Sequence, residues 1–384
     1  MKRAWLLSAL LACGVEVVEL APEGDVLVIG DVPRDAIARF ATGETAPDPK
    51  MLALRYPSDG VALPANLAPL RFTWDGDKDA TYELTLRADD RALRVYTLDT
   101  SALIPVERWR TLLAANALTV ELRSLNGPGK KMLRSAEPRT IAIRPALNGT
   151  LYFASPMTSE RARLADANST SVDERERALG SVSGARMARV GPRGIELADR
   201  VLAVPEGGRI AHPSWAADGN ALVVTYWPPE LKLAGDPSDE HEGSQLARVT
   251  LDGGFTPLPL MGADSPRRAR YAPDGRTLAF EAGKLDAPEL FLVGSEGGMA
   301  RRLACGEPGM GMGMMMPKKD AARAPAWLAD SWLAFVSKRP YLDPPHAQIW
   351  VAELSREEAR CAAPFWLPAQ DAQRDYEALW FERE

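Results

Sequence analysis

The chain has 384 residues, a formal net charge of −6 and hydrophobic residues at 46% of its positions. This length allows two globular domains preceded by a lead segment. Its Lys and Arg residues form no basic block, which argues against the charge pattern of a nucleic-acid-binding protein. We therefore expect no nucleic acid among its partners.

The first residues, MKRAWLLSALLAC, combine a short basic start with an apolar run. This pattern predicts a signal peptide over residues 1–12, and the run is too short to cross a bilayer, which needs about 20 apolar residues. Residues 10–13 resemble a bacterial lipobox, which makes Cys13 the predicted lipidation site. We expect an outer-membrane lipoprotein of the bacterial cell envelope, facing the periplasm or the cell surface, whose lipid is its only membrane contact. The alternatives are a periplasmic or secreted protein without lipid, or a cytosolic protein with an apolar N-terminus.

Residues 13–50 mix short apolar runs with Pro, Gly and Asp, so we interpret them as a linker with room for one hairpin. Residues 51–148 show about six short runs of alternating hydrophobicity separated by turn residues, which predicts an all-β sandwich. Their succession of short strands and turns is similar to that of fibronectin type III or immunoglobulin-like modules. We expect Trp74 and Tyr82 to be core residues, and the stretch PVERWRTLLAAN to form a short helix.

The second half repeats one pattern three times, in HPSWAADGNALVVTY, RARYAPDGRTLAFEA and RAPAWLADSWLAFVS. Each copy has an aromatic residue, an Asp-containing turn and an apolar strand, and the copies are 56 residues apart (271 − 215 and 327 − 271). The third copy has Ser331 in place of the turn glycine, so we expect a different turn there. The residues that define the repeat, all interpreted as structural, are Trp215, Asp218, Gly219, Tyr271, Asp274, Gly275, Trp327 and Asp330.

Each copy is followed by further strands, so one unit reads as a four-stranded blade of a β-propeller, whose blades have roughly 40–50 residues or more. Residues 149–384 are the predicted propeller domain, with three clear repeats and a diverged blade within residues 149–208. Cys305 and Cys361 are also 56 residues apart, which suggests equivalent positions in successive blades. Outer strands diverge, whereas a disulfide needs Cα atoms within about 7 Å, so we expect two separate thiols, with a disulfide as the alternative.

The repeat resembles that of TolB-like propellers, also called WD40-like or PD40 repeats. The best match is RYAPDGRTLAF, followed by SWAADGNALVV and AWLADSWLAF, and the resemblance covers about residues 205–360. That family usually builds six blades, whereas only three copies are clear here. The resemblance implies a propeller of the bacterial envelope that binds other envelope proteins, without naming the partner.

Several catalytic patterns are missing from the sequence, including His-Glu-x-x-His, Gly-x-Ser-x-Gly and the Cys-x-x-Cys-His haem motif. We expect a non-enzymatic binding or scaffolding protein without cofactors. The alternatives are an enzyme with a site in the central channel, or a copper-handling protein, since soft thioether and thiol ligands suit Cu(I). The candidate copper ligands are Cys305, Met310, Met312, Met314, Met315 and Met316.

Two further features have a structural and a functional interpretation. The acidic stretch GDPSDEHEG, residues 235–243, is read as a solvated loop, with calcium binding as the alternative. His212 precedes the first repeat motif, where we expect it to line the propeller end or to pack at the start of a blade, with ligand contact as the alternative.

Overall fold

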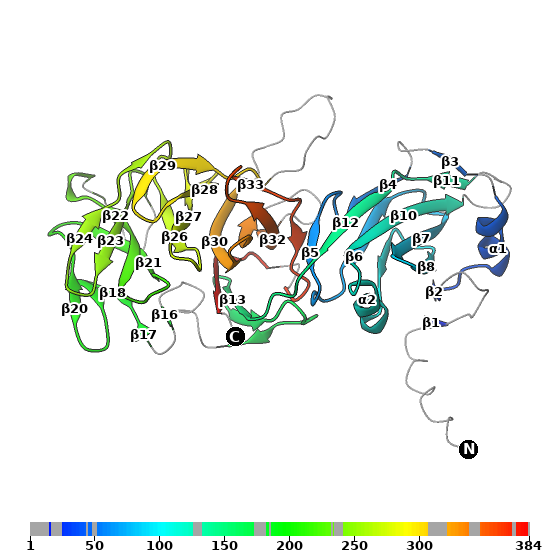
Figure 1. Ribbon diagram of the computed structural model, residues 1–384, viewed down its shortest axis with the longest axis horizontal. Coiled ribbons are helices and arrows are strands. Elements are labelled where there is room, and N and C mark those ends of the chain that lie inside the picture. The colour runs from blue at the N-terminus through cyan, green and yellow to red at the C-terminus, as the bar shows by residue number, and fades with distance from the viewer. Residues whose placement is uncertain are drawn as a thin grey trace, which may run out of the picture. The chain divides into compact units, whose positions relative to one another are not determined.

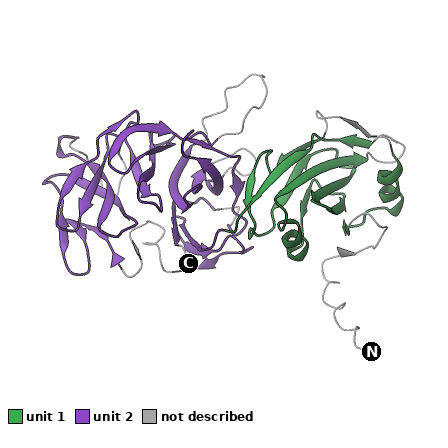
Figure 2. Cartoon of the chain, in the orientation of Figure 1, with its two compact units in different colours: residues 1–146 green, residues 147–384 purple. Residues whose placement is uncertain are grey.

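The computed structural model describes residues 15–16, 25–43, 45–47, 52–125, 133–172, 182–183, 186–231, 233, 241–305, 321–337, 346–370 and 374–382. Over these residues the chain forms many β-strands and two α-helices, so the predicted all-β class is confirmed (Figure 1). The chain divides into two compact units, Met1–Ala146 and Leu147–Glu384 (Figure 2).

The described residues of unit 1 form two β-sheets. The larger has the order β1-β2-β8-β7-β10-β11-β3, with β12 pairing to β10 and β5, and the smaller has the order β4-β6-β9. The rings of Trp74 on β6 and Tyr82 on β7 lie 5.4 Å apart, so side chains of the two sheets meet. Both residues are buried, as expected of core positions. The likeness to an immunoglobulin or fibronectin module stays a prediction. The strands are β1 (Val15–Glu16), β2 (Asp25–Ile29), β3 (Thr45–Pro47), β4 (Ala53–Tyr56), β5 (Ala62–Pro64), β6 (Arg71–Asp75), β7 (Thr81–Ala88), β8 (Arg91–Thr97), β9 (Ser101–Leu103), β10 (Ala117–Leu125), β11 (Leu133–Ser135) and β12 (Arg139–Arg144).

The predicted short helix of unit 1 is α2, Val106–Leu112, which begins directly after Pro105. Proline suits the start of a helix because it has no N–H to leave unpaired there. Trp109 is fully buried, and its indole Nε1–H donates a hydrogen bond of 2.8 Å to the carbonyl oxygen of Leu67. The helix therefore adds a large apolar side chain with a satisfied polar atom to the core.

The expectation that residues 13–50 form a linker is wrong for the described part of that segment. Strand β2 pairs in parallel with β8, and helix α1, Arg34–Thr42, follows it. Ala36 and Phe40, four residues apart on one helix face, are buried, and the ring of Phe40 lies 5.6 Å from that of Tyr96. Pro, Gly and Asp suggested a linker, but the apolar side chains between them are covered by the sheet.

The described residues of unit 2 form five successive sheets of three or more strands, here called blades 1 to 5, and one two-stranded hairpin. Blades 3, 4 and 5 contain the three predicted repeats. The strands of 149–208 fall into blades 1 and 2, so that segment contributes to two blades rather than one. Blades 1 and 2 comprise β13 (Thr150–Ala154), β14 (Ser159–Ala162) and β15 (Thr170–Ser171), and then β18 (Arg189–Gly191), β19 (Gly194–Glu196) and β20 (Val201–Ala203), with the hairpin β16 (Val182–Ser183) and β17 (Arg186–Met187) between them.

In blades 3 to 5 consecutive strands pair antiparallel in chain order, except for the short strands β25 and β34. The short β25 pairs in parallel with β29, and both β33 and β34 pair with β32. A 3-10 turn, Pro229–Leu231, follows the second strand of blade 3. Their strands are β21 (Arg209–Trp215), β22 (Ala221–Trp227), β23 (Gln245–Thr250) and β24 (Phe255–Pro257); β25 (Leu260–Met261), β26 (Arg267–Tyr271), β27 (Thr277–Ala282), β28 (Glu289–Gly294) and β29 (Gly297–Arg302); and β30 (Ala322–Ala329), β31 (Trp332–Ser337), β32 (Gln348–Ser355), β33 (Arg360–Cys361) and β34 (Phe365–Trp366).

The blades bury both faces of their sheets against one another. On β22, Leu222 and Val224 belong to a core cluster shared with blade 2, whereas Val223 belongs to a cluster shared with blade 4. Successive side chains of a strand point to opposite faces, so a strand covered on both sides is apolar throughout. This explains why residues 221–227 are buried without interruption.

The last strand of the chain completes the first blade. Strand β35, Ala378–Glu382, pairs antiparallel with β13, from Thr150 opposite Glu382 to Ala154 opposite Ala378. It also lies beside β30 and β31 of blade 5. Blade 1 therefore combines strands from both ends of unit 2, which joins blade 5 to blade 1 and covers strand edges that would otherwise be exposed.

Candidate functional site

The Asp-Gly turns of blades 3 and 4 hold the ends of the first strands in place. Asp218 Oδ1 accepts the backbone N–H of Asn220 at 3.0 Å, and Asp274 Oδ1 accepts that of Arg276 at 2.9 Å. Gly219 and Gly275 have φ of +67° and +70°, which a residue with a Cβ adopts only with strain. These four residues shape the turns that follow Trp215 and Tyr271.

The turn of blade 5 differs, as expected from its missing glycine. Strand β30 continues past Trp327 to Ala329, which pairs directly with Trp332 across Asp330 and Ser331. Arg356 supports this turn: its Nη1 lies 2.6 Å from Asp274 Oδ2 and its Nη2 lies 3.3 Å from Asp330 Oδ1. One guanidinium thus connects the turn aspartates of blades 4 and 5, while its carbon lies 4.9 Å from the Trp327 ring centroid.

The repeat aromatics meet at a pocket. The first strands of blades 3, 4 and 5 lie next to one another and to β35, and they contribute Trp215, Tyr271, Trp327 and Trp380. These rings line a cavity of about 330 Å³, together with Arg270, Phe381, Glu382 and several Ala and Pro residues. The sequence indicated the first three aromatics as structural residues only. Trp380 follows Trp327 by 53 positions rather than 56 and was missed.

Arg270 is the buried cation of this pocket. Its side chain lies against Trp380, with the guanidinium carbon 5.9 Å from the ring centroid, and only 4% of the residue is exposed. Burial lowers the pKa of Arg270 to about 9, with Arg268 acting in the same direction and Glu281 opposing it. The guanidinium therefore stays charged at neutral pH in a setting that disfavours its charge. Burial also raises the pKa of Tyr271 to about 12, so its phenol is neutral.

A β-bulge lies three residues before each repeat aromatic, in the first strand of blades 3, 4 and 5. His212, Arg268 and Ala324 have φ near 50°, and the pairing register shifts at each of them. These positions lack the glycine that usually marks a left-handed conformation, so the bulges could not be predicted from the sequence. The 3.2 Å contact of His212 Nδ1 with Thr225 Oγ1 places this histidine at the start of blade 3.

Neighbouring blades hold these bulges in position. Thr225 of blade 3 accepts the backbone N–H of Arg268 at 3.1 Å, and Glu281 of blade 4 accepts that of Ala324 at 2.9 Å. Glu281 also pairs with the buried Arg267, Nε to Oε1, at 3.4 Å. The two acceptors lie 56 positions apart, but a Thr and a Glu share no motif that a single sequence reveals.

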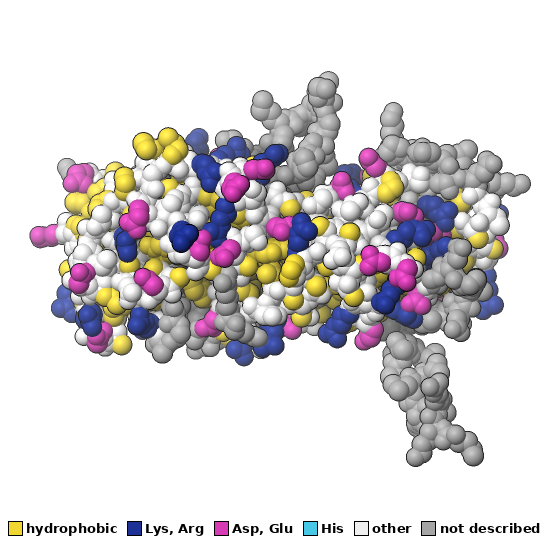
Figure 3. All heavy atoms as spheres, in the orientation of Figure 1, with side chains coloured by type: hydrophobic (Ala, Val, Ile, Leu, Met, Phe, Trp, Pro, Cys, Tyr) yellow, Lys and Arg dark blue, Asp and Glu magenta, His cyan; other side chains and the backbone are white. Residues whose placement is uncertain are grey.

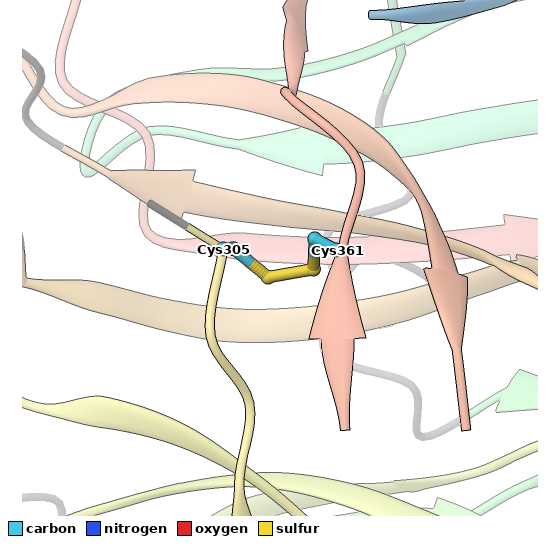
Figure 4. The surroundings of a disulfide bond; sticks show 2 residues. All are labelled: Cys305 and Cys361. Carbon is cyan, nitrogen blue, oxygen red and sulfur yellow. A yellow bond between two sulfur atoms is a disulfide. The ribbon is translucent and has the colours of Figure 1, made fainter. Parts of the chain in front are cut away.

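The expectation of two separate thiols is wrong, because Cys305 and Cys361 form a disulfide (Figure 4). Their Cα atoms lie 4.6 Å apart. After β29 the chain crosses to blade 5, where the carbonyl oxygen of Ala304 accepts the N–H of Cys361 at 2.8 Å. The 56-residue spacing therefore did not place the two cysteines at equivalent positions on the outer strands of successive blades. As a disulfide, Cys305 offers no thiolate to copper.

Other predicted sites lie wholly or partly outside the described residues. Cys13 and the five methionines of the proposed copper site belong to this group, as do residues 235–240 of the acidic stretch. His241, which is described, accepts the indole N–H of Trp227 with its carbonyl oxygen at 2.9 Å. Within the described ranges, His, Cys, Asp and Glu form no group of three that could hold a metal ion.

Lys and Arg are interspersed with Asp and Glu over the face seen in Figure 3. A protein that follows a phosphate backbone usually gathers its cations into a stripe or patch. The expectation of no nucleic-acid partner stays a prediction. None of the helices in the described part of the chain is both long and apolar enough to span a membrane.

No family model and no curated protein matches the chain. Similar solved structures include TolB from Acinetobacter baumannii, at 11% identity and a TM-score of 0.34, covering 81% of this chain and 68% of that one. A puromycin-hydrolysing peptidase from Mycobacterium tuberculosis has 15% identity and a TM-score of 0.30, covering 65% of this chain but only 36% of its own. A putative TolB from Agrobacterium tumefaciens has 9% identity and a TM-score of 0.27, covering 79% of this chain and 99% of its own. At these values none of the three assigns a family or an activity.

Proposed function

We propose that unit 2 is a binding module rather than an enzyme, and that it holds a segment of another envelope protein in the aromatic pocket. The observation that supports this proposal is the convergence of Trp215, Tyr271, Trp327 and Trp380 on one cavity. Aromatic side chains, tryptophan and tyrosine above all, supply much of the energy of protein interfaces. Four blades contribute to these walls, so the pocket exists only in the assembled propeller.

We further propose that the protein is exported and anchored through lipid on Cys13. The disulfide between Cys305 and Cys361 supports export, because disulfides persist mainly in oxidising compartments outside the cytosol. The predicted lipobox would then place the propeller at a membrane surface, where its partners are other envelope proteins.

The test is chemical cross-linking in intact cells, followed by identification of the captured proteins. Trp380→Ala removes one wall of the pocket, and Trp366→Ala is the matched control, since both tryptophans are half-buried. Trp366 donates to Gln348 Oε1 at 3.1 Å in blade 5 and does not line the pocket. We expect Trp380→Ala to lose the protein that the native chain and Trp366→Ala both capture. Equal capture by all three would contradict a role for the pocket.

The anchor is tested separately with Cys13→Ser. If Cys13 carries lipid, the native chain fractionates with membranes and labels with a fatty-acid analogue, and the variant does neither. Membrane association retained by Cys13→Ser would show that the lipobox interpretation is wrong. Pocket binding by the purified variant should be unchanged, because the substitution lies in a different unit.

A further inference from the structure

The charged groups that line the aromatic pocket are already engaged within this chain. Among the described residues of the lining, Arg270 and Glu382 carry charge, and both have interaction partners in the chain. Arg270 Nη1 donates to the carbonyl oxygen of Ala269 at 3.5 Å, and the guanidinium carbon lies 5.9 Å from the Trp380 ring centroid. A charged ligand would therefore have to displace existing contacts to find a partner, and a buried charge without a partner is costly.

Two further rings of the pocket also hold an arginine of this chain. The guanidinium carbon of Arg356 lies 4.9 Å from the ring centroid of Trp327. That of Arg186 lies 6.0 Å from the ring centroid of Trp215. A group of aromatic rings commonly attracts a cation, because the faces of the rings carry negative potential. Here the chain's own guanidinium groups already use that attraction, so an arriving lysine or arginine side chain would meet like charges.

The remaining lining and the size of the cavity limit what can enter. Besides the four rings and the two charged residues, the walls consist of Phe381, Pro273 and three alanines. Ligand pockets in proteins commonly measure about 300–1,000 Å³, so a cavity of about 330 Å³ is at the small end. It has room for one large side chain with its backbone, and not for a helix or a folded loop. An aromatic side chain gains from leaving water and from edge contacts with the surrounding rings.

We propose that the pocket receives one uncharged aromatic side chain of the partner, and that the arginines at its rings exclude basic side chains. The four rings of the pocket enclose the arriving ring. Arg270 and Glu382 keep the partners that they have within the chain, so binding leaves no charge unpaired. This inference rests on the proposed function, because it names the part of the partner that the pocket holds.

The test uses the full chain with Cys13→Ser and the probe peptide acetyl-Gly-Phe-Gly-amide, with Lys or Glu in place of Phe in two matched peptides. Both ends are blocked, so the peptides differ in charge only at the central side chain. Binding is measured by titration calorimetry and by tryptophan fluorescence at two salt concentrations. Because an unpaired charge is costly to bury, we expect the Phe peptide to bind at least about ten-fold more tightly than either charged peptide. Its affinity should not change with salt, since its binding pairs no charges. Tighter or equal binding of the Lys or Glu peptide would overturn the inference, and so would binding of maltotriose, a neutral saccharide, in place of the peptides.

A protein-side arm tests why basic side chains are excluded. Arg356→Gln removes the cation from the Trp327 ring, so we expect the preference for the Phe peptide over the Lys peptide to shrink several-fold. The control is Arg302→Gln, which should keep the native preference, because Arg302 pairs with Glu289 at 2.8 Å and does not line the pocket. An unchanged preference in Arg356→Gln would contradict exclusion by the arginines. If none of the three peptides binds while Trp380→Ala still abolishes capture in cells, this inference fails and the proposed function stands.

Discussion

The contact between blades 3 and 4 and the contact between blades 4 and 5 follow one plan with different chemistry. In both, the second strand of one blade accepts the N–H of a bulge residue in the next blade. The acceptor is the hydroxyl of Thr225 in the first contact and the carboxylate of Glu281 in the second. A hydroxyl needs no counter-charge, whereas a buried carboxylate does, and Arg267 provides it.

The contact between blades 4 and 5 also contains an ion-pair bridge and a disulfide bond. Arg356 connects Asp274 to Asp330, and the disulfide joins Cys305 to Cys361. Blade 5 is the one that lacks the turn glycine. Contacts with the neighbouring blade can thus hold in place a blade whose turn lacks the glycine. Equivalent positions of two blades therefore need not contribute equally to stability.

The largest expected effect is that of Glu281→Gln. The substitution keeps the shape but removes the carboxylate charge that pairs with the buried Arg267, and breaking a buried ion pair typically costs about 3–5 kcal/mol. The control is Glu296→Gln, because Glu296 pairs with Arg248 at the surface, 3.0 Å away, where ion pairs contribute about 0–1 kcal/mol. The free energy of unfolding in urea measures both. A cost below 1 kcal/mol for Glu281→Gln would mean that the carboxylate gives the second contact no special strength.

Removing the disulfide should have the next largest effect. A bond that closes a loop between residues 56 positions apart restricts the unfolded chain, and such bonds contribute about 2–4 kcal/mol. We expect the double variant Cys305→Ser, Cys361→Ser to unfold at a correspondingly lower urea concentration. The native chain measured with a reductant should match the variant. If the reductant leaves the native chain unchanged, the disulfide does not stabilise blade 5.

Arg356→Gln should cost about 1 kcal/mol, in a pH-dependent way. Burial alone would raise the pKa of Asp274, but the N–H of Arg276 and the Arg356 guanidinium hold it below its ordinary value of 3.8. A lowered carboxyl pKa stabilises the folded state at neutral pH, and that contribution is lost as the pH falls below 3.8 toward the folded-state pKa. The stability difference between the native chain and Arg356→Gln should therefore shrink in acid. Arg301 donates to the backbone carbonyl oxygens of Glu357 and Arg356, which do not titrate, so Arg301→Gln should show a constant difference.

The sequence predicted the parts of unit 2 that depend on local patterns. The 56-residue spacing located blades 3 to 5 because Asp218, Gly219 and the apolar strand act through neighbouring residues. Helix α2 and the buried Trp74 were predicted for the same reason. The pairing of β35 with β13 joins residues more than 220 positions apart (378 − 154), and neither strand has a turn motif to mark it.

The pocket was harder to predict, because its aromatics have two roles. Trp215 and Trp327 are nearly buried, so the repeat pattern correctly indicated structural residues, yet their edges also line the cavity. Arg270 appeared as an ordinary polar residue of a strand. The burial of Arg270 depends on Trp380, which comes from the last strand of the chain. It also depends on the bulge at Arg268, a position without the glycine that would indicate a positive φ.

The smallest expected effect, that of Thr225→Val, makes the comparison sharper. The substitution keeps the shape of the side chain and removes the acceptor of the Arg268 N–H and the partner of His212. Losing one neutral hydrogen bond costs about 1 kcal/mol, several-fold less than expected for Glu281→Gln. Amide hydrogen exchange should be faster at residue 268 in this variant and at residue 324 in Glu281→Gln. Thr250→Val, which alters an exposed hydroxyl on the neighbouring strand, should change neither amide. If Thr225→Val costs as much as Glu281→Gln, the two contacts are energetically equivalent despite their different charges, and the stability of the bulge would then come from the surrounding packing.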